Sequence, residues 1–383
     1  MKCWTRRGFL SAAIATLAAS KLHAAAPITS GYVYIGSSAK GDGEGIHVGK
    51  WNAASGTLSD VRLAFPANSP SFQVGGGNNG MRFLLSGHQP QPTVAALSSF
   101  RVEASGDLKV INTVTVSDLE ESMIQIVLDH TQRCLVSASY RSGKVFSFKV
   151  APDGHLSDPV SQFQLSGHGP NVRRQTTAHA HGAVISPGNR FALVNDLGTD
   201  RIMVYKLNAS TAELTPNEPP FYNAAPGSGP RHLAFHPNGK WAYSINELDS
   251  TITFLSWNEK TGVLTTVDNL STLSPGADVA KNRAGEVIID QAGRFLYACN
   301  RGPNEELLVY AIEPTGRLTL TGRTPLGGKE ARHFALAPGG NFLVVAEQFT
   351  NQVSVFTRDR STGLLVPTGN KYPVNKASCI VFV

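Results

Sequence analysis

Cysteine and charged residues are both scarce in this sequence. It has 4 cysteines in 383 residues, and Asp, Glu, Lys and Arg together make up 16% of the chain. Apart from Cys3, near the start, each cysteine stands in a short apolar run without the spacing of a metal site. We expect these to be small buried side chains, since a disulfide would require two of them to be neighbours in space. They are Cys134, Cys299 and Cys379.

Three further absences narrow the class of protein. No long helical periodicity is present, whereas Gly (37) and Pro (22) are frequent, a composition typical of many short strands joined by turns. No Gly-x-Ser-x-Gly elbow occurs, which disfavours serine-esterase chemistry. The glycines at 75–77 are followed neither by Gly-Lys-Ser/Thr nor by a helical pattern, so they do not form a phosphate-binding loop.

The first residues have the features of an export signal. Thr5-Arg6-Arg7-Gly8-Phe9-Leu10 is a twin-arginine motif, and the small apolar run at 11–19 is too short to span a bilayer. We therefore predict a cleaved signal peptide at 1–26, a mature domain at 27–383, and a periplasmic or secreted location. The alternative is an uncleaved cytoplasmic N-terminus.

The export signal carries much of the excess positive charge. It contains Lys2, Arg6, Arg7 and Lys21 and no acid, so its removal lowers the formal net charge from +6 to +2, with 30 basic and 28 acidic residues left. A chain so nearly balanced offers no electrostatic footprint for nucleic acid or an anionic membrane. We expect no nucleic-acid partner, and no membrane contact after the signal is removed.

A short turn that ends in leucine recurs at intervals of 47 to 58 residues. Its seven copies are 54–58, 104–108, 152–156, 210–214, 260–264, 314–318 and 361–365. A second marker, a turn followed by an aromatic residue, keeps the same period, as in His236-Pro237-Asn238-Gly239-Lys240-Trp241. Roughly four short strands fit each interval, which is typical of a propeller blade.

These repeats predict an all-β, seven-bladed propeller. A single blade cannot bury both of its faces, but a closed ring buries each blade against its neighbours. The first strand, at 32–35, and the last, at 378–383, each lack a complete blade, so we predict that they share one and close the ring. The period alone also fits six or eight blades.

The clearest repeat runs from Gly229 to Leu255. Large apolar residues alternate there with small or polar ones, the period of a pleated strand. Arg231 and Glu247 lie at strand ends, where a stiff scaffold places a side chain that can still meet solvent.

Five segments carry a resemblance to a known family. They are His179-Ala180-His181 through Ser186-Pro187, 196–201, Gly229-Pro230-Arg231-His232, 246–250 and Asn300-Arg301-Gly302. In these segments the chain resembles the lactonase family of seven-bladed propellers, over about residues 30–383. That family includes the bacterial 6-phosphogluconolactonase type and the fungal carboxy-muconate lactonizing enzyme. The resemblance implies a small-molecule lactone substrate and no required metal or cofactor, and we expect a monomer.

The resemblance also implies a lactone pocket at one mouth of the central channel. The implied catalytic residues are His181, Arg231, Glu247 and Arg301, and the implied substrate-binding residues are His179, Glu286 and Arg332. The chain departs from the family in the first two blades, where members usually have a Pro-x-His-like strand start. Here these starts are Ser69-Pro70-Ser71-Phe72 and Glu121-Ser122-Met123-Ile124, which leaves the substrate open.

Opening a lactone requires an activated water, relief of charge at the carbonyl oxygen, and a holder for anionic groups. Glu247 or His181 would take the proton from water if its pKa is tuned towards neutrality. Arg231 and Arg301 would bind a carboxylate or the developing oxyanion. We therefore predict an exported lactonase for a sugar-acid or other anionic lactone. The export signal argues against a phosphorylated lactone of central metabolism.

Other interpretations stay open on the sequence alone. The same groups would support a carboxy-muconate-type cycloisomerase, and the weakened repeats of the first two blades would suit a non-catalytic periplasmic binding platform. A purely structural role is the alternative for three of these residues. Arg231 and Glu247 would then simply pair with each other, and Arg301 would cap a turn. His179 and His181 would ligate a metal if a third ligand lay near them.

Overall fold

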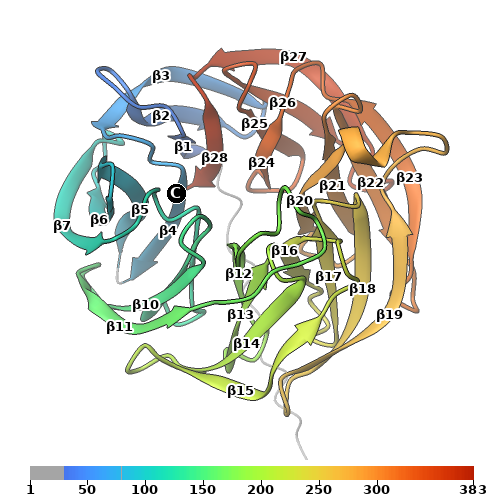
Figure 1. The fold of residues 1–383 in the computed structure, drawn as a ribbon. Helices are drawn as coiled ribbons and strands as arrows, with labels where there is room; N and C mark the ends of the chain where they lie inside the picture. Colours follow the sequence, from blue (N-terminus) through green and yellow to red (C-terminus); the bar gives the residue numbers. More distant parts are fainter. Residues whose placement is uncertain (1–29, 79) are drawn as a thin grey trace, which may run out of the picture.

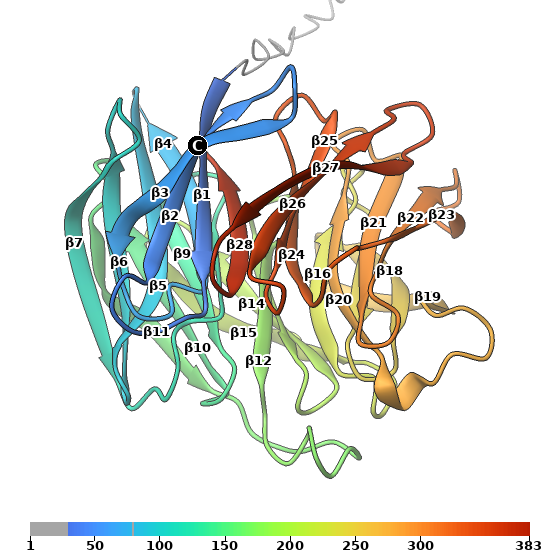
Figure 2. The same cartoon turned by 90° about the horizontal axis from the view of Figure 1, so that it is seen from above.

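Seven antiparallel sheets are arranged around a central axis. The computed structural model describes residues 30–78 and 80–383, so the export signal predicted at 1–26 lies outside the described residues. Within the described part, seven four-stranded sheets form a ring (Figure 1), which Figure 2 shows edge-on. The seven-bladed propeller predicted from the repeats is therefore confirmed.

The first three blades include both ends of the chain. Blade 1 contains β28 (Ala377–Phe382), β1 (Ser30–Ser37), β2 (Gly45–Asn52) and β3 (Thr57–Pro66). Blade 2 contains β4 (Phe72–Asn78), β5 (Met81–Gln91), β6 (Val94–Val102) and β7 (Leu108–Ser117). Blade 3 contains β8 (Gln125–Leu128), β9 (Cys134–Ser139), β10 (Lys144–Val150) and β11 (Leu156–Gln164).

The other four blades follow the chain in order. Blade 4 contains β12 (Ala180–Ile185), β13 (Phe191–Asp196), β14 (Arg201–Asn208) and β15 (Glu213–Asn223). Blade 5 contains β16 (Pro230–Phe235), β17 (Trp241–Asn246), β18 (Thr251–Asn258) and β19 (Val263–Ser271). Blade 6 contains β20 (Arg283–Ile289), β21 (Phe295–Arg301), β22 (Glu306–Ile312) and β23 (Leu318–Pro325). Blade 7 contains β24 (Ala331–Leu336), β25 (Phe342–Glu347), β26 (Gln352–Arg358) and β27 (Leu365–Pro373).

The two ends of the chain close the ring, as predicted. Strand β28 pairs antiparallel with β1, with Ile380 opposite Ile35 and Val381 opposite Tyr34. Strand β28 in turn contacts the innermost strands of blades 7 and 2. Because the last strand completes the first blade, the described ring has no open sheet edge at the point where the chain begins and ends.

The apolar core lies between neighbouring blades. Tyr243 and Phe254 of blade 5, for example, pack in one buried cluster with Leu296 and Tyr310 of blade 6. The leucine-ending turns, which join the third and fourth strands, lean on the preceding blade. Gly316 lies in one such turn at φ +85°, and a Cβ there would collide with the Phe254 ring.

Two connections project from the same side of the ring (Figure 2). One is the loop at 165–179, which leads into β12, and the other carries the 3-10 helix η1 (Val279–Lys281). No helix in the described part of the chain is both long and apolar enough to cross a membrane.

Candidate functional site

One repeated position on the innermost strands supplies three charged or titratable side chains. In β12, β16 and β24 a bulge leaves one extra residue opposite the second strand, namely His181, Arg231 and Arg332. A bulge bends the strand locally and re-aims the side chain of the extra residue. Ser378 occupies the same position in β28. Blades 4, 5, 7 and 1 thus each place one extra residue at the equivalent position of the innermost strand.

A second repeated position follows the second strand of each blade. Glu247 comes directly after β17, Arg301 ends β21, and Gln348 comes directly after β25. Because the first two strands of a blade are antiparallel, the second ends beside the start of the first. Both repeated positions therefore lie at the same mouth of the ring.

Glu247 lies at this mouth and is held by three arginines. Its carboxylate accepts hydrogen bonds from Arg174 at 2.7 Å and Arg301 at 2.8 Å, and it lies 3.4 Å from Nε of Arg231. Burial alone would raise its pKa, but the charges of Arg301, Arg174 and Arg231 outweigh burial and hold the pKa well below its usual range. Glu247 is therefore ionised at neutral pH and a poor proton acceptor.

Arg301 is buried between two carboxylates. Its side chain is 1% exposed and donates to Glu330 at 2.8 Å, in addition to its bond with Glu247. Glu330 also accepts a hydrogen bond from Arg283 at 2.8 Å. Burial would lower the pKa of Arg301, but the two carboxylates reverse this and raise it. Arg301 is a permanent cation whose neighbours fix its position.

Arg231 is equally buried, and its donors are directed at the protein. It donates to the carbonyl oxygen of Gly285 at 2.7 Å and to that of Arg332 at 3.4 Å. Burial lowers its pKa to about 9, and the nearby charges of Arg301 and Arg332 act in the same direction. Arg231 therefore links the innermost strands of blades 5, 6 and 7.

The two histidines nearest this network are neutral. Burial lowers the pKa of His181 well below its usual value, and the charge of Arg231 adds to the effect. Burial and Arg231 likewise lower the pKa of His232 to about 4, although its Nδ1 lies 2.7 Å from Oε1 of Glu286. The His181 and His232 rings meet edge to face, with centroids 5.2 Å apart.

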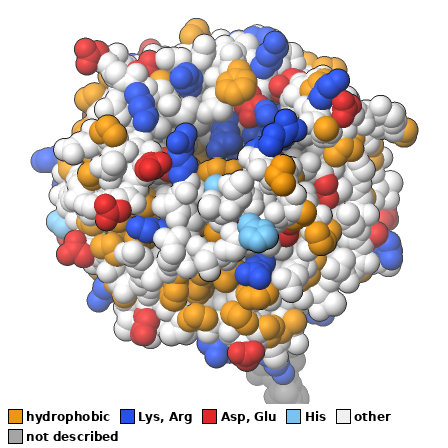
Figure 3. Space-filling view, in the orientation of Figure 1, with side chains coloured by type: hydrophobic (Ala, Val, Ile, Leu, Met, Phe, Trp, Pro, Cys, Tyr) orange, Lys and Arg blue, Asp and Glu red, His pale blue; other side chains and the backbone are white. Residues whose placement is uncertain are grey.

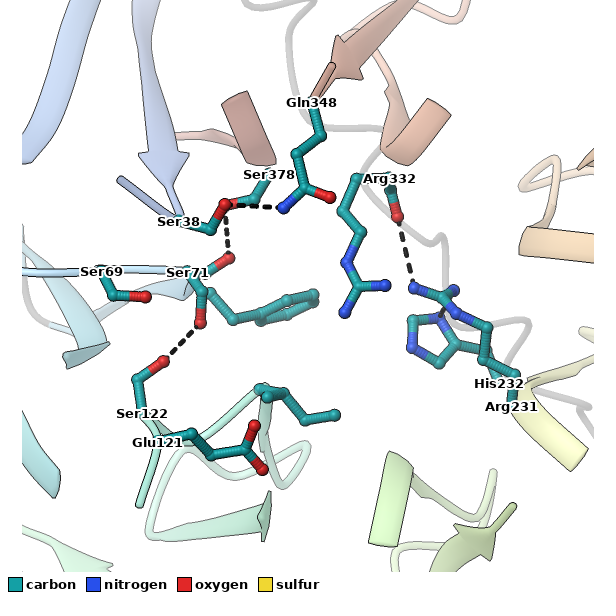
Figure 4. A pocket seen from close by; sticks show the side chains of 12 residues that line it. Ser38, Ser69, Ser71, Glu121, Ser122, Arg231, His232, Arg332, Gln348 and Ser378 are labelled. Atoms are coloured by element: carbon teal, nitrogen blue, oxygen red, sulfur yellow. Dashed lines mark hydrogen bonds between the residues drawn. The ribbon is translucent and has the colours of Figure 1, made fainter. Parts of the chain in front are cut away.

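A cavity of about 170 Å³ opens beside the network, and polar groups dominate its wall. Figure 3 shows Lys and Arg side chains around a hollow near the centre of this face, and Figure 4 shows the cavity from close by. The residues that line it are Ser38, Ser69, Ser71, Phe72, Glu121, Ser122, Ile124, Arg231, His232, Arg332, Gln348 and Ser378.

The guanidinium group of Arg332 points into this cavity (Figure 4). Whereas Arg231 and Arg301 have carboxylates within 4 Å, no described carboxylate lies within ion-pair distance of Arg332. Burial and the charge of Arg301 lower its pKa. Arg332 is thus a cation whose protein partners are distant and whose donors face the cavity.

Glu121 faces the same cavity from the segment that precedes β8 (Figure 4). Its side chain is 18% exposed, compared with 5% for Glu247 and Glu286. Burial raises its pKa to about 7, even though the backbone N–H of Arg141 and the charges of Arg141 and Arg332 act in the opposite direction.

The structure brings the four predicted catalytic residues together, since the Glu247 carboxylate lies within 4.0 Å of His181, Arg231 and Arg301. Proton transfer by Glu247 or His181 was predicted on the condition that its pKa is tuned towards neutrality, and this condition is not met. The three arginines keep Glu247 ionised, and burial keeps His181 uncharged. Arg231 and Glu247 do form an ion pair, but not with each other alone, because Glu247 also accepts from Arg174 and Arg301.

The three predicted substrate-binding residues have different surroundings. Arg332 lines the cavity, whereas Glu286 lies behind it and holds His232. His179 stacks on Tyr140, with ring centroids 4.4 Å apart, and its Nδ1 lies 3.0 Å from the Tyr140 carbonyl oxygen. In the described part of the chain, no three His, Cys, Asp or Glu side chains cluster in a way that could hold a metal ion.

Several site residues were missed by sequence reasoning. Glu121 and the serines at 69, 71 and 122 stood out only as departures from the family pattern. Arg174 comes from the irregular loop at 165–179, which has no periodic signal. The bulge position can be recognised in the sequence, because the same Arg-His pair begins the innermost strand of two blades. The pairs are Arg231-His232 and Arg332-His333.

The three described cysteines are free and buried, as expected from the sequence. They lie on β9, β21 and β28, in three different blades, and are Cys134, Cys299 and Cys379.

The fold is a closed seven-bladed propeller. A cavity lined by charged side chains and hydroxyl groups lies at one mouth of its central channel. Residues 32–382 match the family model for the seven-bladed β-propeller lactonases. The chain belongs to this lactonase family.

Relatives and solved structures agree with this assignment. The chain is 30% identical over 352 residues to a 6-phosphogluconolactonase of Bacillus subtilis, covering 91% of this chain and 97% of the relative. It is 32% identical over 349 residues to a 6-phosphogluconolactonase of Formosa agariphila, covering 89% and 96%. The structure of a periplasmic gluconolactonase from Pseudomonas aeruginosa superposes with a TM-score of 0.84 at 30% identity, covering 92% of this chain and 99% of the other.

Proposed function

We propose that this protein is an exported lactonase that hydrolyses an unphosphorylated sugar-acid lactone in the cavity beside Arg332. The observation that carries the proposal is the Arg332 guanidinium, which faces the cavity without a carboxylate partner among the described residues. A lactone carbonyl oxygen gains negative charge when water attacks the carbonyl carbon. A fixed cation in a partly buried site stabilises that charge more than bulk water does.

The buried network behind the cavity gives Arg332 its fixed position. Arg231 donates to the carbonyl oxygen of Arg332, and Glu247 holds Arg231 and Arg301 in turn. In this scheme Glu247, Arg231 and Arg301 position the substrate-binding cation. The Glu247 carboxylate accepts from Arg174 and Arg301, and the terminal nitrogens of Arg231 and Arg301 donate to protein oxygens, which supports a positioning role.

The serine wall supports a polyhydroxylated substrate. Ser71 and Ser122 hydroxyls lie 2.7 Å apart, and Gln348 donates to the Ser38 hydroxyl at 2.6 Å. Hydroxyl and amide groups can donate and accept, so they complement the ring hydroxyls of a sugar-acid lactone. A volume of about 170 Å³ equals the liquid volume of roughly six water molecules, which suits one sugar ring.

The charge of the cavity favours a substrate without phosphate. A phosphate group is usually bound by several donors or cations, whereas Arg332 is the described cavity-lining cation without an ion-pair partner. Glu121 adds partial negative charge on another part of the wall. The name of the Pseudomonas aeruginosa structure, a periplasmic gluconolactonase, agrees with such a substrate and with export.

Hydrolysis of glucono-δ-lactone and of its 6-phosphate would test the proposal. Proton release by the mature protein is followed in a pH-stat, with spontaneous hydrolysis subtracted. We expect a higher kcat/KM for the unphosphorylated lactone and a fall of about 10²–10³-fold in Arg332→Ala, the range for loss of one oxyanion donor. Arg360→Ala, at an exposed site, is the control. Absence of turnover, or a preference for the phosphate, would overturn the proposal.

Export is tested separately in a bacterial host with a twin-arginine pathway. The full chain is expected in the periplasmic fraction, and replacement of both Arg6 and Arg7 by Lys is expected to retain it in the cytoplasm. Equal distribution of the two forms would show that residues 1–26 do not direct export.

A further inference from the structure

Glu121 is the carboxylate that the described residues place on the cavity wall. The other three carboxylates near the axis are held by basic side chains: Glu247 by three arginines, Glu330 by Arg283 and Arg301, and Glu286 by His232. Their side chains are 5–6% exposed, whereas that of Glu121 is 18% exposed. Glu121 can therefore meet a substrate or water in the cavity, and the others are enclosed by protein.

The backbone holds the Glu121 carboxyl group in place. Oε1 accepts a hydrogen bond from the backbone N–H of Arg141, in the turn after β9. Oε2 has only a distant cation, Nε of Arg141 at 3.9 Å. One oxygen is thus anchored, and the carboxyl group is directed towards the cavity that Arg332 also faces (Figure 4).

The surroundings of Glu121 suit proton transfer near neutral pH. Burial raises its pKa to about 7. The charged and titratable groups that face it are Arg141 and Tyr140 from the turn after β9 and Arg332 from β24. A general base works best when its pKa lies near the operating pH. A large fraction of it is then unprotonated, and it still binds a proton strongly enough to take one from water. A guanidinium group keeps its proton in proteins, so Arg332 cannot take the proton from water.

We propose that Glu121 is the general base, and then the general acid, of lactone opening in this protein. This inference rests on the proposed lactonase function. The Glu121 carboxylate takes a proton from water as the water oxygen bonds to the lactone carbonyl carbon, and Arg332 holds the carbonyl oxygen as it becomes negative. The bond from that carbon to the ring oxygen then breaks, and the ring oxygen takes the proton from Glu121. The products are a hydroxyl and a carboxylic acid, which loses its proton to solvent, so atoms and charge balance.

The other titratable groups near the cavity fit this role less well. Glu247 is held in the ionised form by three arginines, and its carboxylate oxygens are occupied by their donors. His181 does not line the cavity, and the Nδ1 of His232 is engaged by Glu286. Ser71 and Ser122 bond to each other, and no histidine lies within hydrogen-bond distance of either hydroxyl among the described residues.

The test is the pH dependence of kcat/KM for glucono-δ-lactone in Glu121→Gln. Gln keeps an oxygen that can accept from the Arg141 N–H, but it cannot take a proton. Wild type is expected to lose activity as pH falls through about 7. Glu121→Gln is expected to lose about 10²–10⁴-fold in kcat/KM at neutral pH, and its residual activity should lack that acid limb.

Two further variants make the result decisive. Glu120→Gln removes a neighbouring carboxylate that is exposed to solvent, so it should retain wild-type activity and the acid limb. Glu121→Asp keeps a carboxylate one methylene further back, so it should lower kcat but retain an acid limb. If Glu121→Gln proves unstable in thermal unfolding, the pH profile of Glu121→Asp is compared with that of wild type instead.

The outcomes separate this inference from the proposed function. An active wild type with an unchanged Glu121→Gln profile would overturn the role of Glu121 and leave the lactonase proposal intact. The same conclusion would follow if Glu120→Gln removed the acid limb to the same extent. A wild type that opens neither test lactone would overturn both.

Discussion

Replacing Glu247 by Gln tests whether this residue organises the arginine network or takes part in proton transfer. The substitution keeps the size of the side chain and removes its charge. It leaves Arg301 and Arg231 buried without the anion that now lies 2.8 and 3.4 Å from them, and it removes the acceptor pairing with Arg174 at 2.7 Å. If Glu247 organises the site, the loss must appear in stability as well as in activity.

The size of the stability loss follows from these contacts. Each of the two short charge-assisted hydrogen bonds is worth about 1.5–3 kcal/mol. Gln can replace part of one bond but places an N–H₂ donor among guanidinium groups. Neutralising one partner of a buried ion pair costs about 3–5 kcal/mol, so we expect a loss in that range. This is a large part of the roughly 5–15 kcal/mol by which a folded domain is stable.

Urea unfolding, followed by tryptophan fluorescence at several pH values, measures the loss. The pKa of Glu247 is lower in the folded protein than in the unfolded chain. Its stabilisation is therefore fully present above the unfolded pKa of about 4.3 and is lost as pH falls below it. The difference in unfolding free energy between wild type and Glu247→Gln should be largest at neutral pH and should shrink in acid. Glu120→Gln, at an exposed site, should unfold as wild type does.

Equal urea midpoints for wild type and Glu247→Gln at neutral pH would refute the network argument. A difference that stayed constant into acid would refute the charge-based explanation of it. The pH profile of kcat/KM for Glu247→Gln gives a second test. Glu247→Gln should lower kcat/KM but keep the acid limb near pH 7, because Glu121 is intact. Loss of that limb would restore Glu247 as the proton acceptor.

Three further predictions concern the ring itself. Gly316→Ala should destabilise the protein by about 2–4 kcal/mol in thermal or urea unfolding, because the new Cβ adds overpacking against Phe254 to the cost of the left-handed backbone. Gly276→Ala has a nearly equal φ of +84° but open space around it, so it should cost only about 1–2 kcal/mol; equal losses would exclude the contact. The three described cysteines should not react with a thiol reagent in the native protein but should react after unfolding, since burial raises the pKa of Cys299 to about 11 and of the other two to about 12. Deletion of residues 377–383 removes β28 and should abolish cooperative unfolding, whereas a cooperative transition without β28 would show that the closing strand is dispensable.

The sequence was sufficient to predict the propeller fold and the strand ends at which the candidate site residues lie. Alternation with period two and a recurring turn that ends in leucine are local properties. Their regular return along the chain predicted the propeller and the closing strand, and the structure settled the number of blades at seven. The same repeat places Arg231 and Arg332 at equivalent strand starts, and Glu247 and Arg301 at equivalent strand ends. The family resemblance implied that functional side chains gather at one mouth, and the four implied catalytic residues do lie together there.

Only the tertiary structure decided what each of these side chains can do. Glu121 lies on the connection between blades 2 and 3 and Arg332 lies in blade 7, and no local pattern in the chain indicates that they face one cavity. Glu247 and Glu121 are both glutamates beside the axis. Three arginines from other segments keep the first ionised, whereas burial outweighs the more distant charges of Arg141 and Arg332 and raises the pKa of the second to about 7. A pKa depends on the charges and the solvent within a few ångströms, and those neighbours are assembled only when distant parts of the chain meet.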